Sequence, residues 1–160
     1  MLERFKPIDD STAAVRVAYA CSLAPGAVSD LPGLVQVSER STRWVASNER
    51  VVGAVLFRAG RLEEALQRFE QGHRAFEPRA WDLLLLAMIH SRLGHTSEAR
   101  RLLQQAEQWI VEADNAPSGT ETEGAHWSSL TEKPTIRLLH SEAEALIRSD
   151  PVFPADPFAR

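Results

Sequence analysis

Apolar side chains recur every three or four positions along most of this chain, which is the spacing of one face of an α-helix. The stretch 48–113 shows the pattern most clearly. Within it, Leu62, Ala65, Leu66 and Phe69 form an apolar stripe, and polar residues fill the positions between them. Glycine, proline and capping residues interrupt such stripes at intervals. The pattern therefore predicts a series of amphipathic helices joined by short turns.

A second regularity is that this pattern repeats along the chain at a fixed interval. The interval, called the repeat offset below, equals the separation in sequence between Gly60 and Gly94. Ala65 and Ala99 are separated by the same repeat offset. Gly26 precedes Gly60 by this offset as well, so the repeat extends back by one more divergent unit. A fixed period of this size indicates stacked helical hairpins. The predicted hairpins cover residues of about 11–46, 47–78 and 79–113.

The segments that flank the hairpins carry other patterns. Residues 1–10 are charged and contain Pro7, so we expect a lead-in or linker. Residues 114–129 are rich in Gly, Thr, Asn and Pro, which predicts a loop. Residues 133–148 predict a helix with one apolar face, which would cap the exposed edge of the third hairpin. Three prolines in 149–160 predict an extended tail.

Composition narrows the classes of function. The net charge of -4 argues against a nucleic-acid partner. The longest apolar run, Leu83–Ile89, is too short to cross a membrane, so we expect no membrane partner. Cys21 is the single cysteine, which excludes a disulfide within the chain and fits an inert thiol in a reducing cytoplasm. Sixteen Arg stand against two Lys, a bias typical of a GC-rich genome.

The second hairpin resembles a tetratricopeptide repeat. It carries that family's small, large, glycine, alanine, aromatic and proline positions at Gly53, Leu56, Gly60, Ala65, Phe69 and Pro78. The third hairpin keeps Gly94 and Ala99 but places His90 where the family has a large aromatic residue, and the first keeps only Gly26. The resemblance covers residues of about 12–113. It implies an all-α, right-handed solenoid of about three helical hairpins with a C-terminal capping helix.

A narrower resemblance concerns residues 83–110. They look like the repeat module at the C-terminus of large bacterial regulatory proteins of planctomycete type, where that module follows kinase, β-propeller or caspase-like modules. Residues 137–147 are similar to the end of those modules. This resemblance implies a non-catalytic interaction module, and the chain contains no kinase or propeller motif.

Arginines also recur at the repeat period. The repeat offset separates Arg16 from Arg50 and also Arg58 from Arg92, and all four lie on the first predicted helix of a hairpin. In tetratricopeptide repeats those helices line the concave groove, so the resemblance implies a basic trough for the carboxylates of an acidic peptide. The alternative is that they are solvated charges near helix ends. The residues expected in the groove are Arg16, Arg50, Phe57, Arg58, Trp81 and Arg92.

The histidines give a weaker signal. His90 and His95 are five residues apart, and Gly94 is expected to break the helix between them. A helical metal site favours two His at i and i+4 with a further ligand. We therefore expect no metal, no cofactor and no catalytic residue.

Together these patterns predict a protein–protein interaction or scaffold module that docks a partner segment in its concave groove. The first alternative is self-association into a homodimer, through the convex face or through an exposed end near Ala143 and Leu146. The second alternative is an enzyme with a histidine-based site around His90 and His95, for which the sequence offers no partner carboxylate or nucleophile.

Overall fold

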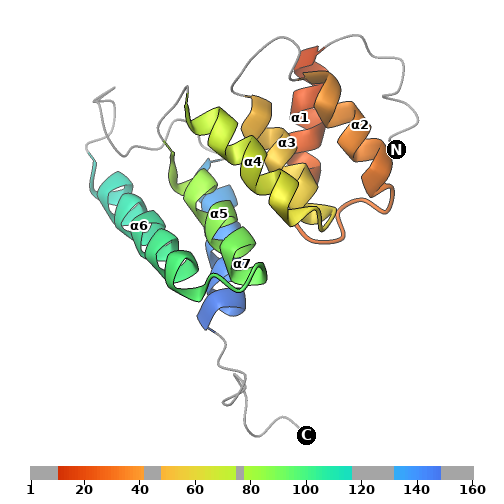
Figure 1. The fold of residues 1–160 in the computed structure, drawn as a ribbon. Coiled ribbons are helices and arrows are strands. Elements are labelled where there is room, and N and C mark those ends of the chain that lie inside the picture. The colour runs from red at the N-terminus through yellow and green to blue at the C-terminus, as the bar shows by residue number, and fades with distance from the viewer. Residues whose placement is uncertain (1–10, 42–47, 75–77, 117–131, 149–160) are drawn as a thin grey trace, which may run out of the picture. The chain divides into compact units, whose positions relative to one another are not determined.

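The fold is all-helical, as the hydrophobic pattern predicts. A computed structural model describes residues 11–41, 48–74, 78–116 and 132–148. These residues form seven α-helices and no strand (Figure 1). The chain divides into two compact units, Met1–Pro78 and Arg79–Arg160. The predicted lead-in, the tail and most of the predicted loop lie outside the described residues.

The described residues of the first unit form four helices. They are α1 (Ser11–Ser22), α2 (Leu31–Ser41), α3 (Glu49–Arg58) and α4 (Leu62–His73). Helix α1 packs against α2 and α3, α2 packs against α3, and α3 packs against α4 (Figure 1). Helix α3 is the centre of this unit, because every residue from Val52 to Phe57 is buried.

The α3–α4 contact depends on a glycine. A Cβ atom at Gly53 would lie 2.8 Å from Cδ2 of Phe69 and 3.2 Å from the carbonyl oxygen of Ala65. Both distances are shorter than ordinary van der Waals contact. The absence of a side chain at Gly53 therefore lets the Phe69 ring lie directly on the α3 backbone.

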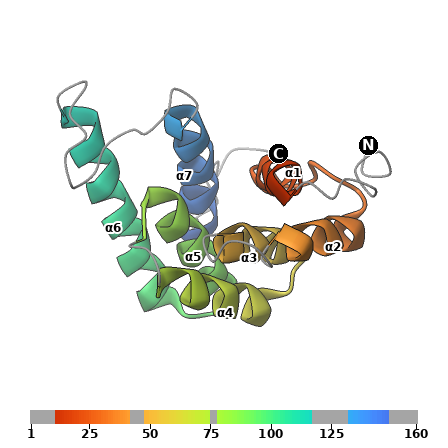
Figure 2. The ribbon, with the colours of Figure 1, turned by 90° about the horizontal axis from the view of Figure 1, so that it is seen from above.

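The second unit contains three helices, α5 (Ala80–Arg92), α6 (Thr96–Asn115) and α7 (Glu132–Arg148). Helix α5 packs against both α6 and α7, which also touch each other (Figure 2). Every residue from Leu83 to Ile89 is buried, as expected for a helix that is apolar on all sides. No helix in the described part of the chain is both long enough and apolar enough to cross a membrane.

One arginine helps to join these three helices. The Arg79 guanidinium forms an ion pair of 3.2 Å with Glu132 at the start of α7 and lies 5.4 Å from the ring centroid of Trp109 on α6. The backbone N–H of Arg79 also donates to the buried carboxylate of Asp82 in the first turn of α5, at 2.9 Å. Asp82 thereby satisfies a donor that the start of a helix leaves without an intrahelical partner.

The turns after α3 and after α5 are built alike. Gly60 and Gly94 have positive φ angles of 77° and 80°. The N–H of the residue after each glycine donates to the carbonyl five residues back, at 3.0 Å for Arg61 to Leu56 and 2.9 Å for His95 to His90. The glycine N–H bonds to the carbonyl three residues back, at 3.1 Å in both turns. Both turns are therefore Schellman motifs, and the repeat offset relates one to the other.

The connection between α1 and α2 is different. Gly26 also has a positive φ angle, of 70°, but α1 already ends at Ser22 and α2 begins at Leu31. The first hairpin therefore keeps the glycine of the repeat without the tight turn. The sequence predicted that this hairpin would be the most divergent.

Candidate functional site

Phe57 does not face a groove. Its side chain is 0% exposed, so the prediction that it contacts a partner is wrong. Its ring lies in the core of the first unit, and the Arg58 guanidinium lies 5.1 Å from the centroid of that ring.

Arg58 forms hydrogen bonds within the first unit. Its Nε donates to the carbonyl of Ser22 at 2.8 Å, and its Nη2 donates to the carbonyl of Leu23 at 3.2 Å. These carbonyls lie at the C-terminal end of α1, where a helix leaves acceptors without intrahelical donors and where a positive charge is favoured. Arg58 therefore ties α3 to the end of α1. A sequence pattern of one helix could not reveal a contact between residues 36 positions apart.

The other predicted groove residues have varied surroundings. Arg50 is half-buried, and a Cβ atom at Gly72 on α4 would lie 2.5 Å from its Cγ. Arg16 is exposed on α1. In the second unit, Arg92 is exposed at the end of α5 and Trp81 is half-buried at its start. A groove that runs through both units stays a prediction.

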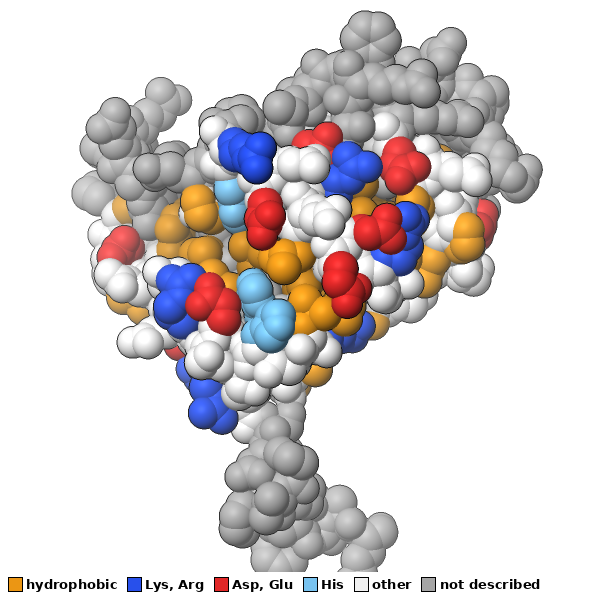
Figure 3. Space-filling view, viewed as in Figure 1, with side chains coloured by type: hydrophobic (Ala, Val, Ile, Leu, Met, Phe, Trp, Pro, Cys, Tyr) orange, Lys and Arg blue, Asp and Glu red, His pale blue; other side chains and the backbone are white. Residues whose placement is uncertain are grey.

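Charges of both signs mix on the surface. On the face drawn in Figure 3, the basic side chains of the described residues stand beside acidic ones rather than gathering in a patch. Arg61 pairs with Glu64, and Arg101 pairs with Glu98. A partner with carboxylates would therefore have to compete with the chain's own carboxylates at these arginines.

The structure brings His90 and His95 together. Their Nδ1 atoms are 3.1 Å apart and the ring centroids 5.4 Å apart. Gly94 ends α5 as predicted, but the Schellman turn folds the chain back so that His95 returns toward His90. Among the described residues, no third His, Cys, Asp or Glu completes a metal-ligand cluster with these two rings.

Elsewhere, partial burial raises the pKa of the Cys21 thiol, which favours the inert protonated form that the sequence predicted.

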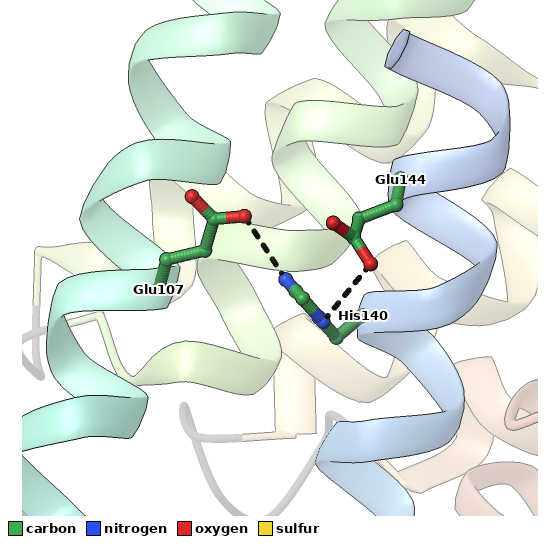
Figure 4. Close-up of side chains that lie close together, drawn as sticks. All are labelled: Glu107, His140 and Glu144. Atoms are coloured by element: carbon green, nitrogen blue, oxygen red, sulfur yellow. Dashed lines mark hydrogen bonds and ion pairs between the residues drawn. The ribbon is translucent and has the colours of Figure 1, made fainter. Parts of the chain in front are cut away.

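A cluster that the sequence did not predict lies between α6 and α7. Glu107 comes from α6, and His140 and Glu144 come from α7 (Figure 4). The imidazole stands between the two carboxylates: Nε2 is 3.1 Å from Oε1 of Glu107, and Nδ1 is 3.6 Å from Oε2 of Glu144. All three side chains are half-buried. The cluster therefore places one imidazole and two carboxylates at a partly desolvated contact of two helices.

Arg148 adds a positive charge to the cluster. Its Nη2 lies 2.6 Å from Oε1 of Glu107, and its Nη1 lies 2.6 Å from Oε1 of Glu144. One guanidinium thus bridges both carboxylates with short, charge-assisted hydrogen bonds. The Arg148 side chain is 54% exposed, so this pairing is largely accessible to water and worth less than a buried pair.

A surface cavity adjoins the cluster. It has a volume of about 520 Å³ and is lined by Arg100, Leu103, Gln104, Glu107 and Arg148. Glu107 and Arg148 thus belong to both the cavity and the cluster. The cavity therefore opens the Glu107 carboxylate to small solutes.

Helical spacing explains how the cluster forms. His140, Glu144 and Arg148 are four residues apart, so they share one face of α7. Leu139 and Ala143, next to them in sequence, are fully buried and fix the rotation of the helix. The spacing His-x-x-x-Glu-x-x-x-Arg was a signal in the sequence. Its partner Glu107 lies 33 residues upstream, and only the packing of α7 on α6 reveals it.

The two residues near which self-association is predicted, Ala143 and Leu146, differ in exposure. Ala143 is fully buried and Leu146 is half-buried. Within the described residues, the exposed large apolar side chains are Val111 on α6, at 59%, and Leu138 on α7, at 50%. Of the described residues of this unit, these two therefore offer more apolar surface to a second copy than Ala143 does.

Comparisons of the chain with protein-family models, with curated proteins and with solved structures gave no match.

Proposed function

We propose that this chain is a non-catalytic protein–protein interaction module, in which tetratricopeptide-like hairpins present a surface to a segment of another protein. The observation that carries the proposal is the structural repeat. The same Schellman turn joins α3 to α4 and α5 to α6, and the repeat offset of the sequence relates the two turns. Hairpins of this kind form extended binding surfaces when they stack.

The helix contacts within the first unit support the same proposal. Helix α3, which opens the second hairpin, packs against both helices of the first hairpin, α1 and α2. This is the relation between neighbouring hairpins that a solenoid requires. In the proposed solenoid, α7 would be the helix that caps the third hairpin, since its buried face packs on α5. The resemblance to bacterial regulatory modules and the single cysteine support a bacterial cytoplasmic setting.

The proposed partner is a protein segment with carboxylates. Arg16 on α1 and Arg92 on α5 are exposed and lie on first helices of hairpins, so each unit by itself keeps one basic position at which a carboxylate of such a segment would dock. Trp81, half-buried on α5, offers partial apolar surface for an anchor residue. The proposed surface excludes Arg58, because its guanidinium donates to the carbonyl of Ser22. It also excludes Phe57, because that side chain is buried.

Fluorescence anisotropy with a defined peptide set tests this proposal. The set contains Asp- and Glu-rich peptides and the same peptides with Asn and Gln in place of the acids. We expect saturable binding of the acidic peptides, and about a tenfold loss of affinity for Arg16→Glu or Arg92→Glu, as for loss of one charge-assisted contact. Arg137→Glu is the matched control, because Arg137 is an exposed arginine on α7, outside the proposed surface.

Two results would refute the proposed surface: equal affinity for the acidic and amide peptides, or equal losses for Arg137→Glu and for the two test variants.

Self-association is the second candidate, because Val111 and Leu138 leave apolar surface exposed on α6 and α7. Light scattering separates the two candidates. A mass that rises with concentration, and falls back to the monomer in Val111→Ser/Leu138→Ser, would favour self-association.

A further inference from the structure

We propose that Glu107, His140 and Glu144 form a binding site for a divalent transition-metal ion, with Zn²⁺ as the best fit. Each residue can offer one ligand atom such that the three atoms all lie within 4.8 Å of one another. Ligand atoms that share one Zn²⁺ lie about 3–4 Å apart, because each is about 2 Å from the ion. The two carboxylates now face different ring nitrogens of His140, so rotation of the imidazole and of one Glu side chain would bring all three ligands around one ion.

The donor set selects the class of ion. One imidazole nitrogen and two carboxylate oxygens suit Zn²⁺, whereas Mg²⁺ and Ca²⁺ prefer oxygen ligands alone. Two carboxylates also offset the charge of a divalent cation. The imidazole distinguishes this cluster from an ordinary group of surface acids.

The helices already hold the ligands in place. His140 and Glu144 are one turn apart on α7, and the residues beside them, Leu139 and Ala143, are fully buried. Glu107 follows Ala106, which is also fully buried, on α6. A site on packed helices needs little reorganisation to bind an ion. Binding would add a link between α6 and α7, whose direct contact is less extensive than the contact of either helix with α5.

Arg148 is the competitor of the metal. Its guanidinium bridges the same two carboxylates that would ligate the ion. Because its side chain is 54% exposed, it can withdraw into solvent when the ion binds. Removal of the Arg148 guanidinium should therefore strengthen metal binding. Adventitious binding at other surface groups would not respond to Arg148 in this way.

The His90–His95 pair is the internal alternative. Two imidazoles 3.1 Å apart could also attract Zn²⁺, but they lack the third ligand that Glu107, His140 and Glu144 together provide. A His90→Gln/His95→Gln variant therefore serves as the matched control. Cys21→Ser removes the one thiol of the chain in the same way.

Zn²⁺ titration against a chromophoric chelator, on the full chain, tests the proposal. We expect one ion per chain, and a loss of affinity of at least about tenfold for Glu107→Gln, His140→Gln or Glu144→Gln. Arg148→Gln should raise the affinity, and the two control variants should leave it unchanged. Zn²⁺ at about one hundred times its Kd should raise Tm by roughly 5 °C or more in the wild type, but not in His140→Gln.

Circular dichroism without metal verifies that each variant folds, and the near-isosteric Glu→Gln changes keep the test valid if His140→Gln does not fold. Three outcomes would overturn the proposal. They are the absence of one-to-one Zn²⁺ binding by the wild type, the loss of binding in His90→Gln/His95→Gln or Cys21→Ser, and an affinity for Arg148→Gln no higher than that of the wild type.

Discussion

The hairpin α3–α4 and the hairpin α5–α6 reach the same turn geometry with different cores. In the first, Gly53 lies under the Phe69 ring, and no side chain could be added without a clash. At the equivalent positions of the repeat, the second has Ala87 and Leu103, both buried. At these two repeat positions, the smaller Gly53 thus occurs with the larger Phe69, and the larger Ala87 occurs with the smaller Leu103. The side-chain volumes at these two positions of the repeat therefore depend on each other. The turn glycine, in contrast, is fixed by backbone conformation alone.

The same pair of hairpins differs in its arginines. Arg58 and Arg92 are equivalent by sequence offset, at the end of α3 and of α5. Arg58 is half-buried and bonds to the carbonyls at the end of α1, whereas Arg92 is exposed. Equivalent positions in a repeat therefore acquire different roles, according to the neighbours that each hairpin meets.

The largest predicted effect concerns the volume coupling. In the wild type, Gly53→Ala forces a Cβ to within 2.8 Å of the Phe69 ring, so we expect a net loss of about 1–2 kcal/mol in the free energy of unfolding. In the Phe69→Leu background, the same change imitates the pair Ala87 and Leu103. There it should stabilise the fold by up to about 1 kcal/mol, because Ala favours a helix over Gly. Urea unfolding of the four proteins of this double-mutant cycle measures the coupling.

The control for this cycle is Ala87→Gly in the second unit, which should cost about 1–2 kcal/mol through lost helix propensity and the loss of a buried methyl group. If Gly53→Ala had the same sign in both backgrounds, the contact between Gly53 and Phe69 would not determine the choice of residue, and the coupling would be wrong.

The next prediction concerns the two arginines. Arg58→Met keeps the apolar stem but removes the two hydrogen bonds to the end of α1, so we expect a loss on the order of 1–2 kcal/mol. Arg92→Met, at an exposed position, should change stability by less than about 0.5 kcal/mol. Hydrogen exchange adds a local readout, since Arg58→Met should lower amide protection at the end of α1. Equal changes for the two variants would contradict the structural role of Arg58.

The sequence predicts the helices well and the surfaces poorly, for physical reasons. Helix positions follow from local periodicity and from Gly60 and Gly94, whose positive φ angles end helices. Phe57 was misplaced because its burial depends on the packing of α3 against α1, α2 and α4, which the pattern along one helix does not show. The Glu107–His140 contact was missed because it depends on how α7 packs on α6, which no local pattern encodes.

The smallest predicted effect concerns the acids that open α4 and α6. Glu64 and Glu98 are equivalent by offset, but Glu64 pairs with Arg61 before it and Glu98 with Arg101 after it. The hydrogen bonds from these arginines hold the pKa of both carboxyl groups below their ordinary value. A carboxyl whose pKa is lowered in the folded state stabilises the fold above its ordinary pKa, and this stabilisation is lost as pH falls through the lowered value.

We therefore expect Glu64→Gln and Glu98→Gln to be slightly less stable than the wild type at neutral pH, and equal to it at about pH 2, well below the ordinary pKa of Glu. Both pairs are solvent-exposed, so added salt should shrink the difference at neutral pH. Thermal unfolding over a pH series, with and without salt, measures this. Because the acids also lie in the first turn of their helices, the helix dipole adds to the effect in both hairpins. A deficit that persisted unchanged at acid pH would show that the side chains act through packing and not through charge.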